Sequence, residues 1–100
     1  MGWATIYIAR LIAGETVSFR PLGHSMSGRI GSGQLCTVEP IGDREPDIGN
    51  VVLCKVGRSQ YLHLVKAKQG NRYQIGNNKG GINGWVTINQ IYGILLSVED

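Results

Sequence analysis

The chain has 100 residues, a length typical of one small domain with a modest core. Its composition is that of a globular protein, with 42% hydrophobic and 17% charged residues, and its net charge of +3 is mild. The ten basic residues are scattered along the chain and form no phosphate-tracking stripe, so the sequence does not favour nucleic-acid binding. Fifteen glycines indicate many tight turns between short elements.

The N-terminal segment combines helical spacing with an apolar composition. Trp3, Tyr7 and Leu11 recur every four residues and Gly14 follows as a stop signal, which predicts a short amphipathic helix over residues 3–13. An arginine interrupts this stretch, which is also shorter than the roughly 20 apolar residues of a membrane-spanning helix. The segment has no basic start or cleavage pattern of a signal peptide. We therefore expect no membrane anchor and a cytoplasmic location.

Downstream of this helix the pattern changes to short extended runs separated by clusters of Gly, Pro, Asn and Asp, including a turn cluster over residues 76–84. The predicted strands are Thr16–Arg20, Gln34–Glu39, Asn50–Val56, Ser59–Ala67, Asn71–Ile75 and Tyr92–Val98. This spacing predicts a mostly β fold, a small coiled antiparallel barrel or sheet with a short N-terminal helix. We expect a single domain over residues 1–100, in which residues 1–14 hold the helix and residues 15–98 form the β core.

The two cysteines, Cys36 and Cys54, lie in apolar strand-like runs and lack the spacing of metal ligands. In a reducing compartment such residues are buried, reduced thiols. The sequence therefore predicts no disulfide, no metal and no other cofactor.

One segment has the composition of a nucleophile loop. Ser25 follows Gly23 and His24 in a glycine-flanked turn, where its hydroxyl and nearby backbone N–H groups would face a substrate. A serine hydroxyl needs a general base to act as a nucleophile at neutral pH. His63, in the apolar strand 59–67, is the candidate base, and the period-2 alternation places it on the face of that strand that we expect to meet the serine loop. Spacing alone also fits a turn serine and a structural histidine, so both interpretations stay open.

Several short motifs in this order resemble the serine peptidase family that includes LexA-type repressors and type I signal peptidases. The first is a strand followed by Gly23-His24-Ser25-Met26, which is similar to the Gly-x-Ser-Met box of that family. Later segments resemble its other boxes in order and spacing: Gly33–Val38, Asp47–Val56, Tyr61–Lys66, Gly76–Asn78 and Ile91–Leu95. The resemblance covers residues 16–98.

The resemblance implies a fold like the LexA C-terminal domain and a soluble serine peptidase that cleaves a peptide or protein substrate with a Ser–His dyad. Ser25 is then the nucleophile, and His63 stands where the family has its lysine or histidine base. Gly23 stands where some members have an oxyanion-hole hydroxyl, so the hole would consist of backbone N–H groups. Met26 would pack beneath the loop, and Asn77 would orient the imidazole through its amide oxygen. With no carboxylate beside it, His63 would keep a pKa near the ordinary value of about 6.5.

Three positions depart from the family pattern. Gly28 replaces a proline two residues after the methionine, and the neutral Asn77 and Asn83 stand where acids are expected. These departures favour a second hypothesis, a catalytically inactive binding or regulatory module of the same fold. Its strand edges would hold an extended peptide or a second copy of the chain as a homodimer. A third hypothesis, a role with an acidic partner, rests only on the basic isoelectric point.

Overall fold

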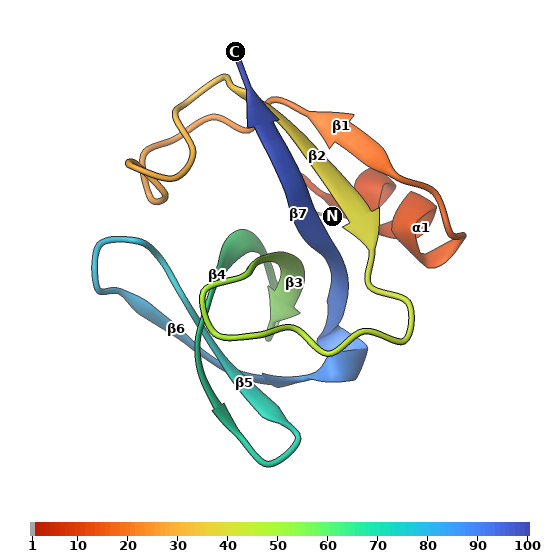
Figure 1. The fold of residues 1–100 in the computed structure, drawn as a ribbon, viewed down its shortest axis with the longest axis vertical. Coiled ribbons are helices and arrows are strands. Elements are labelled where there is room, and N and C mark those ends of the chain that lie inside the picture. Colours follow the sequence, from red (N-terminus) through yellow and green to blue (C-terminus); the bar gives the residue numbers. More distant parts are fainter. Residues whose placement is uncertain (1) are drawn as a thin grey trace.

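The computed structural model describes residues 2–100, so Met1, at the start of the predicted helical segment, lies outside the described residues. Seven strands, one α-helix and one 3-10 turn follow each other along the chain (Figure 1). In chain order they are α1 (Thr5–Ile12), β1 (Val17–Phe19), β2 (Leu35–Pro40), β3 (Val51–Val56), β4 (Ser59–Gln69), β5 (Arg72–Gly76), β6 (Ile82–Thr87), η1 (Ile88–Gln90) and β7 (Ile91–Glu99).

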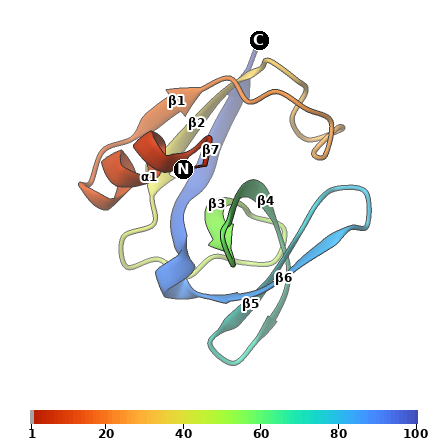
Figure 2. The same cartoon turned by 180° about the vertical axis from the view of Figure 1, so that it is seen from behind.

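The strands form one antiparallel sheet in the order β1-β2-β7-β3-β4-β5-β6. Consecutive hairpins join β3 to β6, and the last strand, β7, returns to lie between β2 and β3. The sheet bends strongly (Figures 1 and 2), yet β1 and β6 remain its two edges and do not pair with each other. The mostly β fold with one short helix is confirmed. The prediction allowed either a barrel or a sheet, and the structure is an open sheet, not a closed barrel.

Helix α1 covers one face of the sheet at β1, β2 and β7. It is shorter than the predicted 3–13 helix, and it buries Ile8 and Leu11 against the sheet. A Cβ at Gly93 of β7 would lie 2.5 Å from the Val38 side chain and 3.0 Å from that of Leu11, so only glycine allows this close approach of helix and sheet. Within residues 2–100 no helix has the length and apolar character needed to cross a membrane.

Two apolar clusters lie on opposite faces of the sheet, and β3 contributes to both. Val51 and Leu53 belong to the cluster under α1, whereas Val52 and Cys54 belong to the cluster enclosed by β4, β5 and β6. Burial on both faces explains why β3 is a continuous apolar run without alternation. Cys54 and Cys36 are fully buried free thiols, as predicted, and burial raises the pKa of Cys54 to about 12.

Strand β6 is the element that the sequence pattern did not predict. The segment 76–84 was expected to be a turn, but the turn is limited to residues 77–81, and the chain is extended again from Ile82. Glycine and asparagine are depleted in strands, and this strand contains both, at Asn83 and Gly84. Pairing with β5 overrides these propensities, with Trp85 opposite Gln74.

Candidate functional site

The loop between β1 and β2, residues 20–34, carries Ser25 at an exposed position. Two buried side chains, Met26 and Ile30, anchor the loop in the cluster under α1, which agrees with the expected packing of Met26 beneath the loop. Gly28 has a φ of +92°, a conformation that proline cannot adopt. The departure from the family's proline therefore follows from the path of this loop.

His63 lies within β4 opposite Val52 of β3, and only 7% of its surface is exposed. Its ring stacks on Tyr61 with 4.8 Å between the ring centroids. Tyr61 and Val65 both pack in the cluster on that face of the sheet, while Leu62 and Leu64 belong to the cluster on the other. The predicted alternation is confirmed, and it directs the imidazole toward the serine loop.

The structure brings Ser25, His63 and Asn83 into one chain of hydrogen bonds. Ser25 Oγ lies 3.1 Å from His63 Nε2, and His63 Nδ1 lies 2.7 Å from the amide oxygen of Asn83. That oxygen can only accept, so Nδ1 carries the proton and donates it. Nε2 then presents its lone pair to the hydroxyl, which is the tautomer that a general base requires.

The register of the sheet explains how a residue of β6 reaches His63 on β4. Strand β5 separates the two along most of their length, but it ends at Gly76, opposite Leu64 of β4 and Ile82 of β6. His63 lies on β4 one residue beyond that end, and Asn83 is the extra residue of a bulge in β6, next to Ile82. The Asn83 side chain therefore contacts the imidazole directly, without an intervening strand.

Burial lowers the pKa of His63, and the hydrogen bond to Asn83 partly offsets this effect. The expectation that His63 keeps an ordinary pKa was therefore wrong. Removal from water disfavours the charged imidazolium, and a neutral amide returns less stabilisation than a carboxylate would. The ring is thus neutral at physiological pH and able to accept a proton.

Asn77, the residue expected to orient the imidazole, has a different position. Its side-chain oxygen accepts the backbone N–H groups of Lys79 and Gly81, both at 2.8 Å, and so shapes the β5–β6 turn. Asn83 occupies the place beside His63 instead. The sequence marked Asn83 as the site of a second expected acid, but the unpredicted β6 left it without an assigned role.

Asn78 is a second residue that the sequence analysis did not assign. Its backbone N–H donates to the Ser25 carbonyl at 3.1 Å, and its side-chain amide donates to the Ser27 carbonyl at 2.8 Å. The β5–β6 turn and the serine loop lie on the same side of the molecule in both views (Figures 1 and 2). These two bonds attach the turn to the loop at Ser25 and at Ser27.

The backbone around Ser25 bears on the expected oxyanion hole. The N–H of Gly23 donates to the Ser32 hydroxyl at 3.1 Å, so it is already engaged. Within residues 2–100, no acceptor takes the N–H of Ser25. The Ser25 N–H is thus free to bind a substrate oxygen.

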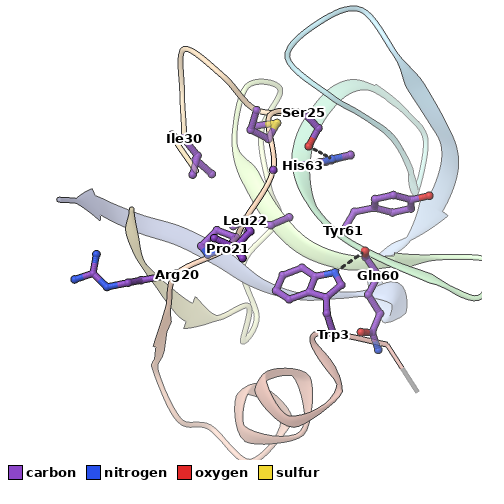
Figure 3. A pocket seen from close by; sticks show the side chains of 13 residues that line it. Trp3, Arg20, Pro21, Leu22, Ser25, Ile30, Gln60, Tyr61 and His63 are labelled. Atoms are coloured by element: carbon purple, nitrogen blue, oxygen red, sulfur yellow. Dashed lines mark hydrogen bonds between the residues drawn. The ribbon is translucent and has the colours of Figure 1, made fainter. Parts of the chain in front are cut away.

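A cleft of about 640 Å³ opens beside the Ser25–His63 pair (Figure 3). Its walls come from the serine loop, from β4 and from the N-terminal segment, and most of the lining side chains are apolar. The lining residues are Trp3, Arg20, Pro21, Leu22, Gly23, Ser25, Met26, Ile30, Gly31, Gln60, Tyr61, Leu62 and His63.

Within residues 2–100, no three His, Cys, Asp or Glu side chains gather closely enough to hold a metal ion. Comparison with known proteins finds no matching family model and no matching curated protein. The site is therefore defined by its own geometry: an open antiparallel sheet that carries a Ser–His–Asn chain at the wall of an apolar cleft.

Proposed function

We propose that this protein is a serine peptidase in which Ser25 is the nucleophile, His63 the general base and Asn83 the residue that orients the imidazole. The observation that carries the proposal is the hydrogen-bond chain itself, with 3.1 Å between Ser25 Oγ and His63 Nε2 and 2.7 Å between His63 Nδ1 and Asn83. A nucleophile, a base and an orienting group at these distances are the shared feature of unrelated serine hydrolases. The motif order that resembles LexA-type and signal peptidases supports the same assignment.

In this mechanism Ser25 Oγ attacks a peptide carbonyl carbon while its proton passes to His63 Nε2. The carbonyl oxygen becomes an oxyanion, which the free backbone N–H of Ser25 stabilises. The C–N bond then breaks, and the imidazolium returns the proton to the leaving amine. Water attacks the resulting ester and gives one proton to His63, and cleavage of the ester releases the acid and restores the Ser25 hydroxyl.

The edge of β4 favours an extended peptide as substrate. From Ser59 to His63 this strand pairs with β3 on one side, whereas β5 pairs with it only from Leu64 onward. In the described sheet, the other side of this half of β4 therefore has no neighbouring strand. Trp3 already occupies the Gln60 carbonyl on this half of β4, and a peptide lying in the cleft can pair with the remaining backbone groups as an added strand.

One observation favours a second candidate, the inactive binding module. The partner of His63 is a neutral amide, which orients the ring but gives the imidazolium no charge stabilisation. In that case the same cleft and free β4 edge would hold a peptide without cutting it.

The test is digestion of a broad peptide library read by mass spectrometry. The wild type should cleave, and Ser25→Ala and His63→Ala should each lower the rate by about 1000-fold or more, because the two groups act as a unit. Ser18→Ala, at an exposed serine of β1, and His24→Ala, at the other histidine, are the matched controls and should retain activity. An inactive wild type that still binds library peptides would support the binding module, and activity that survives in Ser25→Ala would overturn the mechanism.

A further inference from the structure

The N-terminal segment takes no part in the Ser25–His63 pair, yet it forms the far wall of the cleft. Figure 3 shows Ser25 and His63 at one end of the cleft and Trp3 with Gln60 at the other, with Tyr61 between them. Trp3 is 50% exposed and is one of the residues that line the cleft. This half-exposed indole ring can therefore contact a substrate that lies in the cleft.

Trp3 is fixed in this position by several independent contacts. Its indole N–H donates to the Gln60 carbonyl at 3.0 Å, and its ring packs edge-on against Phe19 with 5.5 Å between the centroids. The side chain of Gln60 accepts the backbone N–H of Ala4 at 2.6 Å and donates to the Thr5 hydroxyl at 2.9 Å.

These bonds explain why a polar residue is buried at this point of β4. Gln60 is only 9% exposed, and a buried amide is stable when its donors and acceptors are paired. Its side chain bonds to the first turn of α1, and its carbonyl bonds to Trp3. The wall is therefore built before any ligand binds, and it does not have to be ordered at the cost of binding energy.

The surface between Trp3 and Ser25 has a consistent chemical character. It is formed by the side chains of Leu22, Met26, Ile30, Tyr61 and Leu62. The charged residue among the lining side chains, Arg20, donates to the Gly33 carbonyl at 2.9 Å and extends away from the serine (Figure 3). The cleft thus offers apolar contact and no partner for a charged substrate group next to the serine.

We propose that the cleft selects peptides with a bulky apolar side chain next to the scissile bond, and that Trp3 is the residue that determines this specificity. The proposal rests on the proposed peptidase function and adds the substrate class. Alanine at that position leaves most of a cleft of this size unfilled, whereas leucine or phenylalanine fills more of it and extends further along its apolar wall toward Trp3. Each additional buried carbon of the substrate side chain adds to the difference in binding.

The first arm of the test is a set of peptides that differ only in the residues flanking the scissile bond, with Ala, Leu, Phe or Asp at each. The wild type should favour Leu or Phe over Ala by about tenfold or more in kcat/KM and should reject Asp. Trp3→Ala should lose most of that preference, because its rate on the Leu and Phe peptides should fall further than its rate on the Ala peptide. Trp85→Ala is the matched control, since Trp85 is also an exposed tryptophan, at 38%, but lies outside the cleft.

The second arm measures binding without cleavage and separates this proposal from the mechanism. In a Ser25→Ala, Trp85→Phe protein, Trp3 is the sole tryptophan, and its fluorescence should change on addition of the Leu peptide at concentrations where the Ala peptide has no effect. If the wild type cleaves no peptide but this fluorescence change is observed, the peptidase proposal fails and the proposed apolar binding specificity remains. Equal responses to the Leu and Ala peptides, or an unchanged preference in a folded Trp3→Ala or Trp3→Phe variant, would overturn the specificity proposal.

Discussion

The two members of the Ser25–His63 pair are held by different kinds of structure. His63 belongs to a strand, is buried, and has its ring fixed by Tyr61 on one face and by Asn83 at Nδ1. Ser25 is exposed on an irregular loop. Two hydrogen bonds from Asn78, to the carbonyls of Ser25 and Ser27, attach this loop to the β5–β6 turn.

The difference indicates where each part of the site is sensitive to change. The position of His63 follows from the sheet, so substitutions at Asn83 should alter the electronics and tautomer of the imidazole more than its location. The position of Ser25 depends on the anchoring of its loop by Met26 and Ile30 and on a few polar contacts between two turns. Substitutions there should alter geometry and leave the pKa of His63 unchanged.

The largest effect is expected at Asn83, the partner of the base. Asn83→Ala should lower kcat by about 100-fold, because the imidazole loses the acceptor that fixes its tautomer. Asn83→Asp should instead raise the rate by about tenfold, since a carboxylate stabilises the imidazolium that forms during attack. The same carboxylate raises the pKa of His63, so the acid limb of the rate profile should move to higher pH. The measurement is kcat and kcat/KM on one peptide from pH 5 to 8.

The matched control for this change is Asn77→Asp, which introduces the same charge in the β5–β6 turn. Asn77 accepts backbone N–H groups of the turn and does not contact the imidazole. Its pH profile should coincide with that of the wild type. A profile that moves with Asn77→Asp and stays in place with Asn83→Asp would contradict the assignment of the orienting residue.

A smaller effect is expected at Asn78, which holds the nucleophile. Asn78→Ala removes the side-chain bond to Ser27 and keeps the backbone bond to Ser25, so kcat should fall by about tenfold with little change in KM. Asn78→Gln retains an amide donor and should recover part of the rate. The acid limb of the pH profile should stay in place, in contrast to Asn83→Asp. Asn71→Ala, at the exposed β4–β5 turn, is the control. An Asn78→Ala protein as active as Asn71→Ala would show that the side chain of Asn78 does not hold the Ser25 loop in place.

The same division explains what the sequence could predict. Ser25 and His63 were identified because a glycine-flanked serine and a histidine in an alternating strand are local patterns, and each motif lies within a few residues. The alternation of Tyr61, His63 and Val65 also predicted which face the imidazole occupies. These features depend on the period of one strand, which sequence carries directly.

Sequence patterns could not predict the roles of Asn83, Asn78 and Trp3, for physical reasons. The contact of Asn83 with His63 depends on where β5 ends relative to its neighbours, and the register between strands is a tertiary property. Trp3 was identified as part of a helix period, and its position beside the cleft follows from bonds to Gln60, 57 residues away. Closed barrels and open curled sheets have the same pattern of strands in the sequence. The sequence therefore could not predict that β1 and β6 are unpaired edges of an open sheet.

The smallest effect concerns stability, and it tests the burial of the base independently of catalysis. Burial lowers the pKa of His63 in the folded state, so the unfolded chain binds a proton to this residue more readily than the folded chain does. Stability therefore rises with pH across this window and is lost as pH falls below about 6.5 toward the folded pKa. Free energies of unfolding from denaturant titrations between pH 7.5 and 5 should fall more steeply for wild type and for His24→Gln than for His63→Gln. Because all three proteins share the same carboxylates, parallel curves would mean that His63 is accessible to water in solution. The desolvation that keeps the base neutral would then be absent.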